Sequence, residues 1–163
     1  IFAMNLMIIF LRPMITQLAV FLEEKKISHF ITYKNNLFRI LLGTCTLIYI
    51  VGALIAIPAL DIVYGTDLKQ YQSSFLILLM GGVASTFSTV CDNILTVFRK
   101  QHYLIISFVT GYLVSLMTAR TLVLKYEILG ASLSFLCAMI SWLIVSLVIY
   151  FITSPYTIFR KKK

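Results

Sequence analysis

Long apolar stretches separated by short polar segments make up almost the whole chain. The apolar stretches fall near residues 1–22, 37–60, 74–98, 103–124 and 128–152. Each reaches the roughly 20 residues that an α-helix needs to cross about 30 Å of hydrocarbon. Because the segments between them are short, consecutive helices are expected to pack as neighbours. The pattern predicts an all-α fold: a polytopic transmembrane helical bundle of five membrane-spanning helices over residues 1–152, followed by a basic tail at 153–163.

The composition agrees with a membrane protein and argues against other classes. Of the 163 residues, 60% are hydrophobic and 12% charged, which lies outside the usual range of soluble domains. The net charge of +8 does not indicate nucleic acid, because the basic residues lie mostly at the ends of apolar stretches. Cys45, Cys91 and Cys137 lie within apolar stretches and are odd in number, which supports neither a disulfide framework nor a metal cluster. With no nucleophile beside a base and no phosphate-binding glycine loop, neither an enzyme nor a cofactor is expected.

The positions of the basic residues predict an orientation. Ten are expected on one side of the membrane: Lys25, Lys26, Lys34, Arg39, Arg99, Lys100 and Arg160 to Lys163. Three are expected on the other: Lys69, Arg120 and Lys125. This places the C-terminus in the cytoplasm and Ile1 outside. Since the sequence opens without an initiator methionine, a lost upstream portion is the simplest interpretation, with a processed or split gene product as the alternative.

The connection at residues 23–36 is amphipathic. Ile27, Phe30 and Ile31 can point inward while the lysines face anionic headgroups. The pattern predicts a segment that lies along the inner membrane surface.

The third apolar stretch carries a polar stripe with an acidic residue in it. At 100° per residue, seven polar or small residues fall on one face of the helix: Ser74, Gly81, Ser85, Ser88, Asp92, Thr96 and Arg99. The serines and glycines suit helix packing as well as they suit a cavity. A carboxylate in hydrocarbon needs water or a partner. Asp92 is therefore predicted either to border a hydrated cavity or to form an interfacial ion pair with Arg99 or Lys100.

A second polar line lies in the first apolar stretch. Asn5, Arg12 and Thr16 share one helix face, and Pro13 removes a backbone donor beside the arginine. The guanidinium geometry suits phosphate oxygens. Two interpretations stay open: Arg12 contacts an anion or phosphate, or it pairs with Asp92 of a neighbouring helix.

Small residues at regular spacing mark the last two stretches. One stretch aligns Ser107, Gly111, Ser115 and Thr118, and the other carries Gly130, Ser134 and Ala138 four residues apart. Such faces allow membrane helices to approach closely, so these residues are predicted to pack against other helices.

The order of several segments resembles a known family. These segments are "FLRPMITQLAVFLEEKKISHF", "ALIAIPALDIVYGTDLKQYQSSFLILLMGG", "NILTVFRKQHYL" and "YEILGASLSFLCAMISWLIVSLVIYF". In this order they resemble the C-terminal half of bacterial polysaccharide-biosynthesis flippases of the Wzx type, which belong to the MATE-like multidrug, oligosaccharidyl-lipid and polysaccharide exporter superfamily. The resemblance covers nearly the whole chain and rests on order and spacing together.

The resemblance implies a fold and a function. Such proteins have two helical lobes around a hydrated cavity, and the five helices here would be most of one lobe, with the N-terminal lobe of the same protein as their missing partner. The substrate would be a polyprenyl-pyrophosphate-linked oligosaccharide, flipped by alternating access across the bacterial cytoplasmic membrane during surface polysaccharide biosynthesis. The implied cavity residues are Asn5, Arg12, Thr16, Ser85, Ser88, Asp92 and Thr96.

Two alternatives stay beside this hypothesis. One is a MATE-like drug or ion-coupled exporter whose cavity carboxylate is Asp92. The other is a non-transporting membrane scaffold subunit that binds partner helices through its small-residue faces.

Overall fold

The computed structural model describes residues 2–24, 26–65 and 68–153, and these are almost entirely helical. The four α-helices are α1 (Phe2–Glu23), α2 (Ile27–Tyr64), α3 (Gln72–Val97) and α4 (Leu104–Thr153). Short 3-10 turns at Lys69–Tyr71 and Gln101–Tyr103 lead into α3 and α4. The all-α prediction is confirmed. The basic tail predicted at 153–163 lies, from residue 154 onward, outside the described residues.

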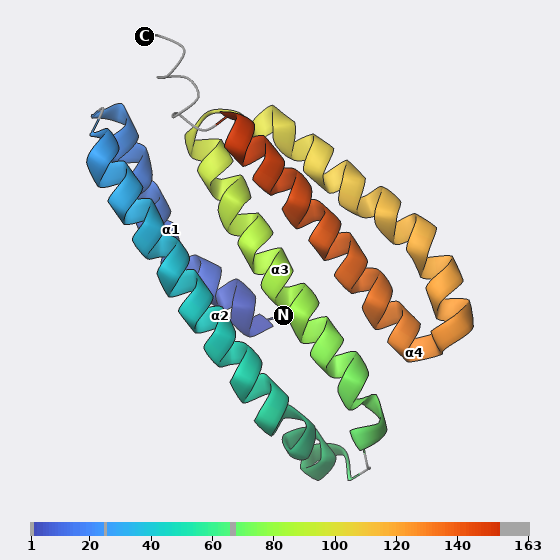
Figure 1. The fold of residues 1–163 in the computed structure, drawn as a ribbon. Coiled ribbons are helices and arrows are strands. Elements are labelled where there is room, and N and C mark those ends of the chain that lie inside the picture. The colour runs from blue at the N-terminus through green and yellow to red at the C-terminus, as the bar shows by residue number, and fades with distance from the viewer. Residues whose placement is uncertain (1, 25, 66–67, 154–163) are drawn as a thin grey trace.

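Three helical stretches are long and apolar enough to cross a membrane. They are Ser28–Val63, Lys69–Val97 and Gln101–Thr153, judged by length and composition in the described part of the chain. This is compatible with a membrane protein, but five separate spans are not confirmed. The last stretch is not straight, since Glu127 has φ 48° and ψ −120°, outside the helical region. The helix reverses there, and its halves at 104–126 and 128–153 run antiparallel (Figure 1).

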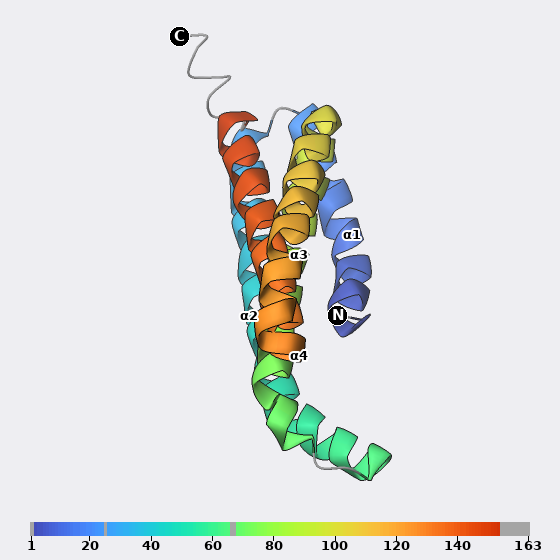
Figure 2. The ribbon, with the colours of Figure 1, turned by 90° about the vertical axis from the view of Figure 1, so that its right-hand side faces the viewer.

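The helices form a layer with one helix packed against it. Figure 1 shows α2, α3, the second half of α4 and the first half of α4 side by side in that order. Helix α1 contacts α2 and α3 and lies on one face of this layer (Figure 2). The most extensive helix contact is between α3 and α4. Helix α3 is therefore the central element, with neighbours on both sides.

The connections between helices lie at two ends of the bundle, and the basic connections share one end. The α1–α2 connection, the α3–α4 connection and the end of α4 lie together at one end, which we call the basic end (Figure 1). Lys26, Arg99 and Lys100 belong to these connections. The α2–α3 connection and the turn at Glu127 lie toward the other end. The side of the membrane on which the basic end lies stays a prediction.

The apolar core gathers around α3 toward the basic end. Helix α1 contributes Ile15 and Leu18, and the other helices complete the cluster. Its other buried members are Phe30, Leu37, Leu41, Cys45, Val90, Ile94, Leu95, Ile149 and Tyr150. Burying such side chains is the main source of packing contact among these helices.

The segment at 23–36 is not a separate surface element. Helix α2 begins at Ile27 and continues without a break to Tyr64, so the lysine and two asparagines at 34–36 lie inside it. Phe30 is buried against the core. Residues 27–36 belong to the long helix because polar residues can end a hydropathic stretch without ending a helix, and their position along a membrane surface stays a prediction. The helix instead stops at Gly65, whose φ of 65° suits a C-cap.

The two halves of α4 pack closely near their turn, as the small residues predicted. Gly130, Ser134 and Ala138 are all buried. A Cβ on Gly130 would collide with the backbone carbonyl of Leu122. One step further along, the hydroxyls of Thr118 and Ser134 are 3.1 Å apart and share a hydrogen bond. In the other predicted line, Ser107 is fully buried, while Gly111, Ser115 and Thr118 are half-buried.

Candidate functional site

Asp92 lies on the face of α3 that packs against the second half of α4. Its carboxylate accepts two hydrogen bonds from α4: the Trp142 indole N–H donates to Oδ2 at 3.0 Å, and the Ser146 hydroxyl donates to Oδ1 at 2.7 Å. The residue is only 6% exposed. Because Trp142 and Ser146 are four residues apart, one face of α4 presents both donors to the acid. Each carboxylate oxygen therefore has a partner.

These contacts bear on the ion-pair interpretations of Asp92 and Arg12; the anion contact of Arg12 stays a prediction. Within the described residues, the ion pair present is Lys26 to Glu24 at 2.8 Å, and no lysine or arginine pairs with Asp92. The predicted ion pairs of Asp92 with Arg12, Arg99 or Lys100 are therefore wrong. Neutral donors replace them, which satisfies the carboxylate without bringing a second charge into the bundle.

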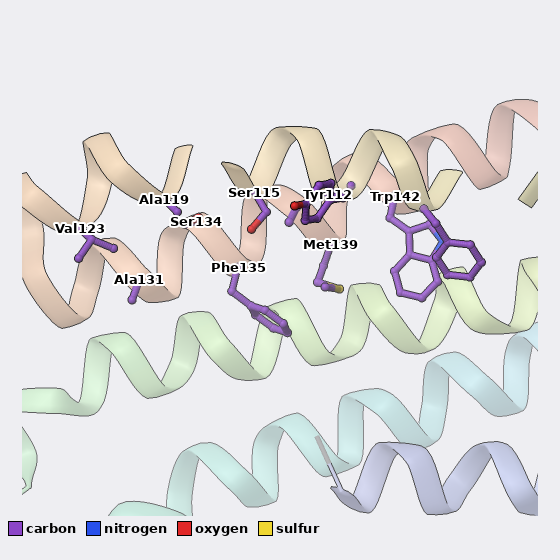
Figure 3. Close-up of a pocket in the computed structure, with 12 residues that line it drawn as sticks. Tyr112, Ser115, Ala119, Val123, Ala131, Ser134, Phe135, Met139 and Trp142 are labelled. Carbon is purple, nitrogen blue, oxygen red and sulfur yellow. The ribbon is translucent and has the colours of Figure 1, made fainter. Parts of the chain in front are cut away.

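A groove runs along the α4 hairpin beside this cluster. It holds about 500 Å³ and is lined from both halves of the helix. Small residues leave the space, among them Gly111, Ser115 and Ala119 in the first half and Ala131 in the second. Figure 3 shows Trp142 at one end of the groove and Val123 with Ala131 at the other. The groove is largely apolar, with hydroxyls from Tyr112, Ser115 and Ser134.

Trp142 belongs to both the groove and the acid cluster. Its ring lines the groove and packs against Phe108, with ring centroids 5.1 Å apart, while its N–H bonds to Asp92. The helices approach closely at this point, since a Cβ on Gly111 would touch Trp142 Cβ and the Ala138 carbonyl oxygen, each at 3.4 Å. Trp142 therefore couples the shape of the groove to the position of the carboxylate.

The polar line of α1 points away from the core. Arg12 and Thr16 are exposed, whereas Ile15 and Leu18 of the same helix are buried. The Thr16 hydroxyl donates to the Arg12 carbonyl at 3.1 Å, inside the helix. The helix continues on both sides of Pro13. The side chain of Asn5 lies outside the described part of α1. Arg12 and Asp92 are thus not brought together.

The other predicted cavity residues divide between the two sides of the α3 stripe. Ser88 is buried and its hydroxyl donates to the Ala84 carbonyl at 2.9 Å. Ser85 is half-buried. Thr96 is exposed and donates to the Asp92 carbonyl at 3.0 Å. The stripe is therefore not a single surface: its Ser88 and Asp92 side faces α4, and its Thr96 side is open.

Sequence reasoning missed the two partners of Asp92. Trp142 is the single tryptophan of the chain and lies well inside an apolar stretch, with Ser146 one turn later. An indole N–H deep in hydrocarbon needs an acceptor. Asp92 in turn needs donors, so the two requirements together could have indicated that Trp142 and Asp92 are partners.

The fold and site define a class: a helical protein with three stretches able to cross a membrane and a buried carboxylate held between two of them. No protein-family model, no curated protein and no solved structure matches this chain. The flippase family stays a prediction that depends on the order of the sequence segments.

Proposed function

We propose that this chain forms part of a membrane transporter for lipid-linked oligosaccharides, in which the exposed polar face of α1 lines the hydrated path of the charged headgroup. The observation that carries the proposal is the exposure of Arg12 in the middle of a mostly apolar helix. The substrate class comes from the family resemblance, and a second helical lobe would complete the path.

The apolar stretch at residues 1–22 is predicted from sequence to cross the membrane, which would place Arg12 at membrane depth. A guanidinium that faces lipid is unfavourable by at least about 3 kcal/mol, so such residues face water, a partner or a substrate. Arg12 makes no ion pair within the described residues. Its five N–H donors are suited to bidentate contact with phosphate oxygens. A polyprenyl pyrophosphate carries two phosphates at the junction of lipid and sugar, which is the part that must cross the apolar region.

The same geometry favours an anionic substrate over a cationic drug. In a cation exporter the cavity carboxylate would have to reach the substrate. Both oxygens of Asp92 are hydrogen-bonded inside the bundle, while the exposed charge is the cation of Arg12. Asp92 then has a structural role, and the substrate contact is assigned to the α1 face.

Water access to α1 tests the first part of the proposal. In a protein whose three cysteines are replaced by alanine, Thr16→Cys should react with a membrane-impermeant thiol reagent. Met117→Cys is the matched control, because Met117 is 77% exposed among apolar residues of α4 and should face lipid. Equal and low labelling at both positions would argue against a hydrated path along α1.

Transport tests the second part. Arg12→Ala should lower surface polysaccharide at least roughly tenfold and leave lipid-linked repeat units on the cytoplasmic side, since a charge-assisted contact contributes about 1.5–3 kcal/mol. Arg12→Lys should restore part of the flux, and Met117→Ala should leave it unchanged. Undiminished polysaccharide in a well-expressed Arg12→Ala protein would rule out the proposed role.

A further inference from the structure

An aromatic cluster joins three helices at the basic end of the bundle. Phe30 of α2 lies 5.9 Å from Phe98, which follows α3, and Phe98 stacks on Tyr150 of α4 at 6.3 Å between ring centroids. The Lys34 ammonium lies 5.8 Å from the centroid of the Tyr150 ring. The cluster therefore fixes one cation at the junction of α2, α3 and α4.

Two more cations follow directly in sequence. Helix α3 ends with backbone bonds from Lys100 N–H to the Leu95 carbonyl at 3.1 Å and from Arg99 N–H to the Thr96 carbonyl at 2.9 Å. This pair of bonds is the Schellman motif, in which the residue after the C-cap takes a left-handed conformation. Here that residue is Arg99, with φ 55°. Glycine is the usual residue there, yet this chain has an exposed arginine. The backbone at this end thus holds two basic residues beside the aromatic cluster.

The protein supplies few anions to neutralise this group. Lys34, Arg99 and Lys100 make no ion pair within the described residues. The carboxylates on the connections at this end are Glu23 and Glu24, and Glu24 already pairs with Lys26. The three cations are left for an external anion.

Exposed apolar residues of α4 adjoin Tyr150, the ring that the Lys34 ammonium contacts. Phe151 packs edge-on against Tyr150 at 5.6 Å and is 67% exposed, and Val148 on the same helix is exposed as well. An amphiphile could place its phosphate against the cations and its chain along this part of α4. A free phosphate would use the cations alone.

From this arrangement we infer that Lys34, Arg99 and Lys100 form a binding site for the headgroup of an anionic phospholipid from the surrounding leaflet. The phosphate contacts the three basic side chains, and an acyl chain lies against Val148 and Phe151. This site is separate from the transport path proposed for α1 and does not depend on it.

Lipid titration of the full chain, followed by native mass spectrometry, tests the site. Phosphatidylglycerol should bind more tightly than phosphatidylcholine, which has the same phosphate but no net charge. Removing each cation should weaken phosphatidylglycerol binding roughly fivefold, the usual effect of one basic residue near a charged membrane surface. Lys100→Ala and Arg99→Gly are the chosen variants. Glycine suits the positive φ at position 99, so this change removes the charge without disturbing the helix end.

The matched control is Lys125→Ala. Lys125 also lies over a tyrosine, with its ammonium 5.2 Å from the Tyr126 ring centroid, but near the α4 turn. It should change phosphatidylglycerol affinity less than twofold, and Arg99→Lys should retain the affinity of the unchanged protein. Circular dichroism should show the same helix content in all variants.

Three results would overturn the site: equal affinity for the two lipids, equal losses in Lys125→Ala and Lys100→Ala, or displacement of the bound lipid by millimolar inorganic pyrophosphate. The last would identify a site for soluble anions instead of a lipid headgroup.

Discussion

The two polar lines of this chain, one on α3 and one on α1, look alike in sequence and differ in the folded protein. On α3, Asp92 turns into the bundle and receives hydrogen bonds from Trp142 and Ser146. On α1, Arg12 and Thr16 turn outward, and the cation pairs with no described carboxylate. A charged residue inside an apolar helix can therefore serve helix packing in one place and face outward in another.

The difference follows from the neighbours of each helix. Helix α3 is central, with apolar residues such as Val90 and Ile94 facing the core and its opposite face meeting α4. Helix α1 lies on one face of the layer and has neighbours on one side only (Figure 2). It uses Ile15 and Leu18 for that contact, which leaves its polar line uncovered.

The largest expected effect comes from moving the helix that satisfies Asp92. Gly130→Ala places a methyl group against the Leu122 carbonyl, a backbone atom that cannot rotate away. The halves of α4 must then separate, and the free energy of unfolding in detergent micelles should fall by about 3 kcal/mol, the upper end for overpacking.

Gly43→Ala is the control for this change, because a Cβ at Gly43 meets nothing within 4 Å. Alanine there should leave stability unchanged or raise it, since glycine is the weaker helix former. Equal losses in the two variants would show that the contact of Gly130 with the Leu122 carbonyl does not limit the packing of the two halves of α4.

Removing the acid itself should have the next largest effect. Asp92→Ala leaves the Trp142 and Ser146 donors without an acceptor, and unfolding experiments should show a loss of about 2 kcal/mol. Trp142→Phe and Ser146→Ala should each cost about 1 kcal/mol, the order of hydrogen bonds between membrane helices.

A double-mutant cycle separates these bonds from the general effect of a buried charge. Trp142→Phe should cost much less in the Asp92→Ala background than in the unchanged protein. Thr96→Ala, which removes a hydroxyl bonded within α3, provides a comparison for a bond that joins no second helix. If the losses of unfolding free energy in Asp92→Ala and Trp142→Phe simply add in the double variant, the hydrogen bond between Asp92 and Trp142 does not stabilise the protein.

Much of the fold could be predicted from periodicity, because hydrocarbon forces every apolar stretch to satisfy its own backbone. The all-α class and the packing of Gly130, Ser134 and Ala138 followed from that. The extension of α2 back to Ile27 did not, since helical hydrogen bonding continues through polar residues such as Lys34 that end a hydropathic stretch.

The site was less accessible from sequence. Helical spacing placed Ser88 and Asp92 on one face, and that face is buried. Spacing along one helix gives no information on which helix lies opposite. Charge attraction therefore suggested Arg12 as the partner of Asp92, whereas its partners in the structure are Trp142 and Ser146. Partner choice depends on the register of the α4 hairpin, which is fixed by close contacts far from Asp92 in sequence.

The smallest expected effect on stability is at Arg12. Because its side chain is exposed and unpaired within the described residues, Arg12→Ala should change the free energy of unfolding by less than about 0.5 kcal/mol, while Leu18→Ala, fully buried on the same helix, should cost about 2 kcal/mol or more. Parallel unfolding curves in micelles measure both. A loss above about 1 kcal/mol at Arg12 would show that its face is packed in the folded protein, and the contrast with α3 would then fail. A negligible loss, together with reduced transport in the same variant, would separate a residue kept for function from one kept for packing.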